Sequence, residues 1–86
     1  MNIQLRLFGA CRDLHPQPVV EFALAEGSRI ADLRRALPAQ LMQADPARAA
    51  ALIAASAFAS DEELLRDSDP VPADGRVAIL PPVSGG

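Results

Sequence analysis

A run of alternating apolar and polar residues at the start of this 86-residue chain constrains its fold more than any other feature. Alternation with a period of two is typical of a β-strand that buries one face. In the run NIQLRLF (residues 2–8) the inward set is Ile3, Leu5 and Leu7, and the outward set is Gln4, Arg6 and Phe8. A domain built on this strand needs a sheet with one covered face.

Two later runs repeat the alternation. VVEFAL (19–24) turns Val20, Phe22 and Leu24 inward, and RVAIL (76–80) turns Val77 and Ile79 inward and Ala78 and Leu80 outward. The first two runs are separated only by the turn-rich GACRDLHPQP, which predicts an antiparallel hairpin. The last run is expected to return beside the first strand and parallel to it, because crossover connections are right-handed.

The stretch EGSRIADLRRAL changes to a helical period. Ser28 is the expected N-cap, Asp32 lies in the first turn, and Pro38 ends or kinks the helix. The stripe expected to face the sheet is Ile30, Leu33 and Leu37, and the residues expected to face solvent are Arg29, Arg34 and Arg35.

The segment from residue 45 to residue 69 has no single pattern. Asp45-Pro46 predicts a second helix start. The alanines that follow favour a helix, but Leu52, Ile53 and Phe58 also suit a buried strand, and we interpret residues 52–58 as that strand. In the acidic stretch 60–69, the spacing of Ser60 and Glu63 suits a capped turn. A solvated loop is preferred there to a metal site.

The order of elements predicts an α+β domain over residues 1–80, with a mixed sheet covered on one face by a helix, and an extended tail over 81–86. No apolar run approaches the about 18 residues of a membrane span, and no secretory signal precedes the first strand. Cys11 is the only cysteine, which suits a reducing compartment, and we expect a cytoplasmic protein. A net charge of −3 without a basic stripe disfavours nucleic acid.

The last six residues, PPVSGG, suit insertion into another protein. Prolines keep a chain extended and glycines make it as thin as a polypeptide can be. An adenylated carboxyl group at the end would be an acyl donor, which a sulfur nucleophile could convert to a thiocarboxylate. All eight basic residues are arginine, so no lysine of the chain could consume the activated group. The expected insertion segment and reactive end are Pro81, Pro82, Val83, Ser84, Gly85 and Gly86.

Three motifs, FGACRDL, EGSRIADLRRAL and DGRVAILPPVSGG, resemble the family of molybdopterin synthase small subunits along the whole chain. The resemblance implies a ubiquitin-like β-grasp fold, no bound cofactor, and a subunit whose partners perform the catalysis. An ATP-dependent activating enzyme would adenylate and thiocarboxylate Gly86. The tail would then enter the large synthase subunit, where the sulfur goes to cyclic pyranopterin monophosphate to build a dithiolene. Two departures are DGR for the family's frequent DGD, and Ser56 near a position where the family often carries asparagine.

A partner surface follows from the outward residues of the strands. Phe8 and Leu80 are expected near the ends of adjacent parallel strands, and Phe58 joins them if the third strand has the interpreted register. Large exposed apolar side chains beside a tail indicate a docking patch. Arg12, at its edge, is placed to pair with a partner carboxylate. Scattered surface apolar residues, cover by the loop 60–69, and a solvated arginine are the alternatives.

Other functions stay open from the sequence. Sulfur could go to thiamine or to another metabolite, Gly86 could be joined to lysines of target proteins, or the domain could be a plain interaction module. Cys11 is expected to be a small buried thiol rather than a sulfur relay. His15 has no second base or nucleophile nearby in sequence, so no catalytic site is predicted around it.

Overall fold

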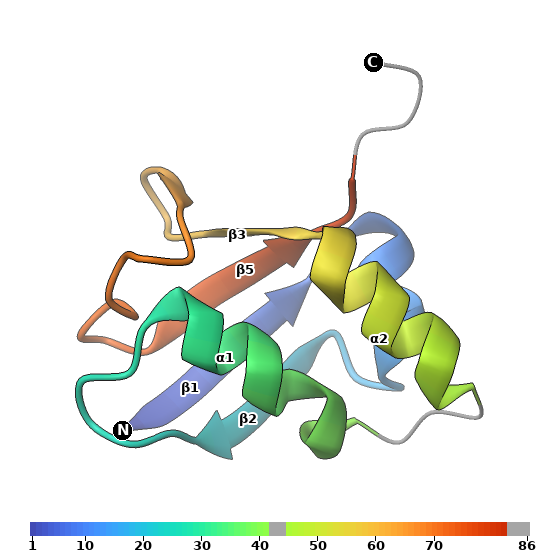
Figure 1. The fold of residues 1–86 in the computed structure, drawn as a ribbon, viewed down its shortest axis with the longest axis horizontal. Coiled ribbons are helices and arrows are strands. Elements are labelled where there is room, and N and C mark those ends of the chain that lie inside the picture. Colours follow the sequence, from blue (N-terminus) through green and yellow to red (C-terminus); the bar gives the residue numbers. More distant parts are fainter. Residues whose placement is uncertain (42–44, 83–86) are drawn as a thin grey trace.

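The structure is a computed structural model that describes residues 1–41 and 45–82 (Figure 1). No helix among these residues is long and apolar enough to cross a membrane. In chain order the elements, with η for a 3₁₀ helix, are β1 (Asn2–Leu7), η1 (Gly9–Leu14), β2 (Val19–Ala23), α1 (Ile30–Ala36), η2 (Leu37–Gln40), α2 (Pro46–Ala55), β3 (Ala57–Ala59), β4 (Leu64–Leu65) and β5 (Arg76–Leu80).

The strands form one mixed sheet in the order β2-β1-β5-β3-β4. β1 pairs antiparallel with β2, and β1 pairs parallel with β5 in a register that sets Leu5 opposite Val77. β3 runs antiparallel to both β5 and β4. The predicted hairpin and the predicted parallel neighbour of the first strand are both confirmed.

Helices cover one face of this sheet, as predicted. α1 lies across the face, and α2 lies beside it on the same side, against η1 and η2 (Figure 1). The alternating strand residues and the helix stripe meet in one core, because both periods place apolar side chains on the same side. The predicted members found buried there are Ile3, Leu5, Leu7, Val20, Ile30, Leu33, Leu37, Val77 and Ile79.

The strand interpreted over residues 52–58 is wrong. α2 continues to Ala55, and β3 is only three residues long. Asp45 caps the helix by accepting a hydrogen bond from the Arg48 backbone N–H at 3.1 Å, and Pro46 occupies the first turn. Once the helix is nucleated, the alanines extend it, and Ile53 reaches the core from a helical position.

Two local predictions are also corrected. The N-cap of α1 is Arg29 rather than Ser28: the Asp32 carboxylate accepts from the Arg29 backbone N–H at 2.9 Å. Ser28 instead donates its hydroxyl to the Ala25 carbonyl at 2.6 Å. The turn after β1 contains a 3₁₀ helix that buries Cys11.

Arg34 was expected to face solvent, but it binds three parts of the molecule together. Its Nη1 donates to the carbonyls of Ile53 at 2.8 Å and Ser56 at 2.6 Å, near the end of α2. Its Nη2 pairs with Asp67 at 2.9 Å, and its guanidinium lies 4.8 Å from the centroid of the Phe58 ring. A cation at a helix C-terminus meets carbonyls that have no partner within the helix, which explains this position.

Candidate functional site

No helix of the described residues covers the other face of the sheet, which we call the open face, although Ala78 and Ala59 at its centre are only 6% and 9% exposed. One row across it holds Arg6, Ala78, Ala59 and Leu64, as the strand registers require. Leu80 pairs with Ala57 in the next row, and Phe8 extends β1 beside them in an extended conformation. Phe8, Val19 and Leu64 are 41%, 39% and 69% exposed, and no other large apolar side chain of the described residues is exposed. With half-buried Leu80, they form what we call the apolar stripe: Val19, Phe8, Leu80 and Leu64.

A charged group borders the apolar stripe. The Asp61 carboxylate pairs with Arg6 of β1 at 2.6 Å and with Arg76 of β5 at 3.6 Å. The Arg6 guanidinium also lies 5.9 Å from the centroid of the Phe8 ring, which keeps both side chains on this face. One carboxylate thus neutralises part of the charge of two arginines and ties the loop before β4 to the open face.

The stretch 60–69 is exposed along most of its length, as predicted for a solvated loop, but it contains the short strand β4 and is held by hydrogen bonds at both ends. The Ser60 hydroxyl accepts from the Glu63 backbone N–H at 3.2 Å, as a helix cap would, but β4 follows instead of a helix. Farther on, the carbonyls of Asp67 and Asp69 accept from the backbone of α1. The segment therefore packs along the edge of the sheet and presents Leu64 on the open face.

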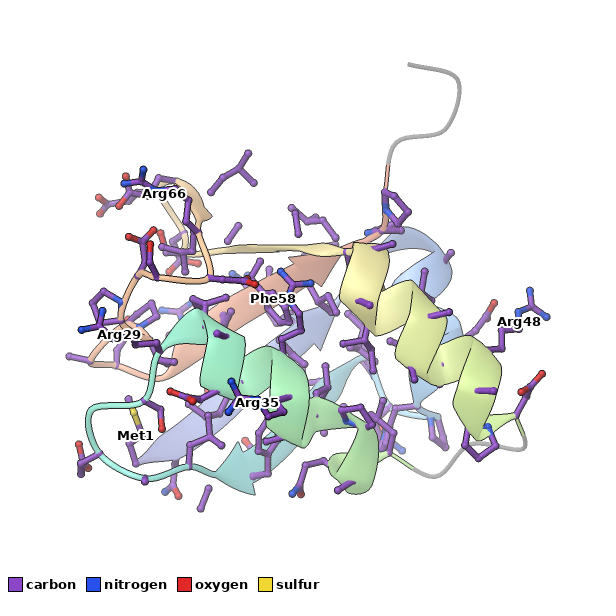
Figure 2. The ribbon with its side chains drawn as sticks, viewed as in Figure 1. Met1, Arg29, Arg35, Arg48, Phe58 and Arg66 are labelled. Atoms are coloured by element: carbon purple, nitrogen blue, oxygen red, sulfur yellow. The ribbon has the colours of Figure 1, made fainter. Side chains whose placement is uncertain are left out.

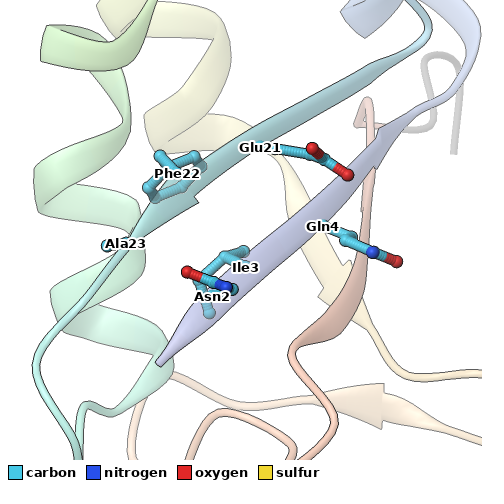
Figure 3. A pocket seen from close by; sticks show the side chains of 6 residues that line it. All are labelled: Asn2, Ile3, Gln4, Glu21, Phe22 and Ala23. Atoms are coloured by element: carbon cyan, nitrogen blue, oxygen red, sulfur yellow. The ribbon is translucent and has the colours of Figure 1, made fainter.

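The other end of the open face is polar. Asn2, Gln4, Glu21 and Ala23 line a shallow hollow over β1 and β2, with Gln4 and Glu21 projecting on the same side (Figure 3). No group of three or more His, Cys, Asp or Glu in the described part of the chain could hold a metal ion. Nothing in this hollow provides a nucleophile with a base, so we assign no chemistry to it.

The tail leaves the sheet at the apolar end of the open face. β5 ends at Leu80, and Pro81 is half-buried beside Gly9, which starts η1. Pro82 is exposed. The predicted insertion residues Val83, Ser84 and Gly85 and the predicted reactive Gly86 lie outside the described residues.

The structure brings together only some of the predicted docking residues. Phe8 and Leu80 lie on neighbouring strands of the open face, and Arg12 is exposed on η1, which follows Phe8. Phe58 was expected to point outward, and this is wrong: it is 0% exposed in the core, inside the outline of the molecule in Figure 2. The reason is register, because Phe58 pairs with the inward-facing Ile79.

Four features of the site were missed in the sequence. The outward position of Val19 could have been predicted from the alternation of the strand, because the next residue, Val20, points inward. Leu64 and Asp61 lie in a stretch with no periodicity. The contact of Gly9 with Pro81 joins opposite ends of the chain, and no local pattern reports it.

Cys11 lies apart from the open face. It is fully buried, and its sulfur is 3.5 Å from the hydroxyl oxygen of Ser56, which also donates to the Leu52 carbonyl at 2.6 Å. Burial raises the pKa of the Cys11 thiol, while the hydrogen bond with Ser56 lowers it by less. A protonated thiol without solvent access is a poor nucleophile, which argues against a sulfur relay.

The architecture, with α1 across one face of the sheet β2-β1-β5-β3-β4, is the ubiquitin-like β-grasp fold. The crystal structure of SAMP1 from Haloferax volcanii has the same fold, with a TM-score of 0.73 and 19% sequence identity over 100% of each chain. No curated protein sequence matches the chain. Residues 5–86 match the ThiS family. The chain therefore belongs to the ThiS family, whose members are ubiquitin-like sulfur carriers that act with partner enzymes.

Proposed function

We propose that this chain is the sulfur-carrying small subunit of a cytoplasmic molybdopterin synthase. Family membership supports the carrier chemistry, and the motifs FGACRDL and DGRVAILPPVSGG support this destination of the sulfur. One structural observation carries the proposal: Pro81 leaves the sheet beside the apolar stripe, so a partner that binds the stripe also receives the tail. Residues 1–80 are the bound domain in this proposal, and residues 81–86 are the inserted segment.

The chemistry takes place on the terminal carboxyl group of Gly86. A carboxylate oxygen attacks the α-phosphorus of ATP in the activating enzyme, and pyrophosphate leaves. Sulfide supplied by a sulfur donor then attacks the acyl carbon and AMP leaves, so that a thiocarboxylate remains. In the large subunit the thiocarboxylate sulfur attacks a carbon of cyclic pyranopterin monophosphate and displaces an oxygen substituent there. Water then hydrolyses the bond between the acyl carbon and the sulfur, which leaves the sulfur on the pterin and restores the carboxylate. The chain itself needs no bound cofactor, because ATP belongs to the activating enzyme.

The apolar stripe is the proposed contact with both partners. Removing apolar area from water contributes about 25 cal/mol per Å², and exposed Phe8 and Leu64 offer the largest side chains for this. Arg12, exposed on η1, is proposed to pair with a carboxylate of the partner. Activating enzyme and large subunit bind the same face in this scheme, so they bind in turn rather than together.

The first experiment measures the intact mass of the chain after co-expression with an activating enzyme and a sulfur donor. The expected result is a chain that ends at Gly86 with one oxygen replaced by sulfur. Deleting Gly86 should abolish the exchange and leave the melting temperature nearly unchanged, because a terminal residue adds little stability. An unmodified mass would contradict the carrier chemistry, and conjugates on other proteins would favour a ubiquitin-like modifier.

The second experiment tests the destination of the sulfur. Purified thiocarboxylate is mixed with a large synthase subunit and cyclic pyranopterin monophosphate, and the dithiolene product is measured. The control is the unmodified carboxylate form, which should give none. If the thiocarboxylate forms but yields no dithiolene, the molybdopterin assignment is wrong, and transfer to a thiamine precursor becomes the next assay.

A further inference from the structure

Gly9 and Pro81 touch at the point where the tail begins. Gly9 has φ of +54°, a conformation that L side chains rarely adopt. A Cβ added at Gly9 would lie 2.8 Å from Cγ and 3.3 Å from Cδ of Pro81. The ring is closed on the Pro81 backbone through Cδ, so a change of pucker could shift Cγ by a fraction of an ångström, but the ring as a whole could retreat only if the backbone moved with it. Because Gly9 has no Cβ, the Pro81 ring can occupy the space beside its Cα.

The neighbouring hydrogen bonds hold both sides of this contact. The Phe8 backbone N–H donates to the Ile79 carbonyl at 3.2 Å, which joins the end of β1 to the end of β5. The Cys11 N–H donates to the Phe8 carbonyl at 3.0 Å, which starts η1. Pro81 has no N–H with which to continue the ladder. The hydrogen bonds of the sheet therefore end just before the tail. At Pro81 the chain is held instead by the packing of the proline ring on Gly9.

The described residues contain two other glycines with positive φ, and Pro81 and Pro82 are not among the atoms nearest to an added Cβ at either of them. Gly75, with φ of +72°, sits where a Cβ would overlap the Asn2 carbonyl, so it is required by the fold. Gly27, with φ of +81°, has nothing within 4 Å of an added Cβ. An alanine at Gly27 would therefore suffer the same kind of backbone strain as an alanine at Gly9, but without a clash with Pro81. This makes Gly27 a matched control.

We propose that Gly9 is a positioning residue for the tail: its bare Cα seats the Pro81 ring and fixes the direction in which the chain leaves β5. This inference rests on the proposed function, in which an enzyme captures and adenylates the terminal carboxyl group. A segment that already points the right way loses less conformational freedom on capture. The contact accordingly acts on the KM for the carrier protein and leaves the chemical step unchanged.

The test compares Gly9→Ala, Gly27→Ala, Pro81→Ala and the double variant Gly9→Ala/Pro81→Ala. Adenylation by the activating enzyme is followed by ATP–pyrophosphate exchange at varied carrier concentration. Gly9→Ala should raise KM at least about fivefold with kcat unchanged, while Gly27→Ala stays within about twofold of wild type. Alanine at position 81 has no Cγ or Cδ, so adding Gly9→Ala to Pro81→Ala should change KM less than about twofold. This non-additivity is the signature of residues in contact.

Equal KM values for Gly9→Ala and Gly27→Ala would overturn the positioning role, and so would effects that simply multiply in the double variant. A separate measurement on the wild-type chain, the nuclear Overhauser effect between Gly9 Hα and Pro81 Hγ, reports the contact without any enzyme. If this signal is present and the wild-type chain is not adenylated, the proposed function fails and the role of the contact in activation fails with it. If the chain is adenylated and the signal is absent, only the inference about Gly9 is wrong.

Discussion

Phe8 and Phe58 show how differently the two faces of one small sheet are used. Phe58 is 0% exposed under the helices, where it contacts Arg34 and packs in the core. Phe8 is 41% exposed on the open face, in the apolar stripe next to the exit of the tail. The same residue type therefore packs in the core on one face and stays exposed on the other, where we propose that a partner binds. Substitutions on the two faces should separate stability from recognition.

The largest expected effect is on the covered face. Phe58→Ala should lower the free energy of unfolding by about 3–5 kcal/mol, because it removes a buried ring and leaves a cavity. Phe8→Ala is the matched control and should cost less than about 1 kcal/mol. Urea unfolding followed by circular dichroism measures both. Similar losses of unfolding free energy for the two variants would mean that Phe8 contributes to stability as much as Phe58 does, and would contradict the proposed difference between the two faces.

A second pair of variants tests whether burial or charge makes an arginine of α1 important. Arg34 is 21% exposed and donates to backbone carbonyls, whereas Arg35, the next residue, is 75% exposed and, among the described residues, pairs with Asp32 of the same helix. Arg34→Met should cost about 2–3 kcal/mol, since it removes the hydrogen bonds of the guanidinium to the part-buried carbonyls of Ile53 and Ser56. Arg35→Met should cost at most about 0.5 kcal/mol. Equal costs in urea unfolding would contradict the assignment of Arg34 as the link between the helices.

On the open face the comparison is between its two ends. Leu64→Asp should weaken binding to the activating enzyme at least about tenfold, because a charge at the apolar stripe would be desolvated on docking. Gln4→Asp places the same charge at the polar end and should change the dissociation constant less than about twofold. Titration calorimetry measures the affinities, and thermal unfolding verifies that both variants fold. If Gln4→Asp weakens binding as strongly as Leu64→Asp, docking is not confined to the apolar end.

Much of the covered face was predictable, and the reason is its periodicity. In β1 every second residue is apolar, and in α1 the apolar residues recur at helical spacing, so each pattern reports the buried side directly. In β5 the large residues Val77 and Ile79 are two apart, although the small Ala78 between them is buried as well. β3 has only three residues, too few to show a period, and the preceding alanines suit several structures. Tertiary context decides such a segment, which is why Phe58 was assigned to the wrong face.

The open face was predictable only in part, because its features join distant segments. Phe8 and Leu80 followed from strand parity, but Leu64 depends on how the stretch after β3 packs. The pairing of Asp61 with Arg6 and the packing of Pro81 on Gly9 are long-range contacts that no local pattern contains. The proposed docking face depends on such contacts, so it can be recognised only in the folded chain.

The smallest expected effect comes from Cys11 and appears only at alkaline pH. Its thiol is buried, and burial raises its pKa, so the folded chain keeps a proton that the unfolded chain loses above about pH 8.5. The unfolded state then binds fewer protons than the folded state, and stability must fall as the pH rises toward the folded-state pKa. The slope is at most about 1.4 kcal/mol per pH unit. The chain contains no tyrosine and no lysine, so few other groups titrate in this range.

Cys11→Ala isolates this contribution, because it keeps every other titratable group. Urea unfolding of both chains between about pH 8 and pH 10 should show a steeper loss of stability in the wild type, and the two slopes should agree below about pH 8. Identical slopes throughout would mean that the thiol ionises as easily in the fold as outside it. Cys11 would then have to be accessible to water, and its exclusion as a sulfur relay would lose its physical basis.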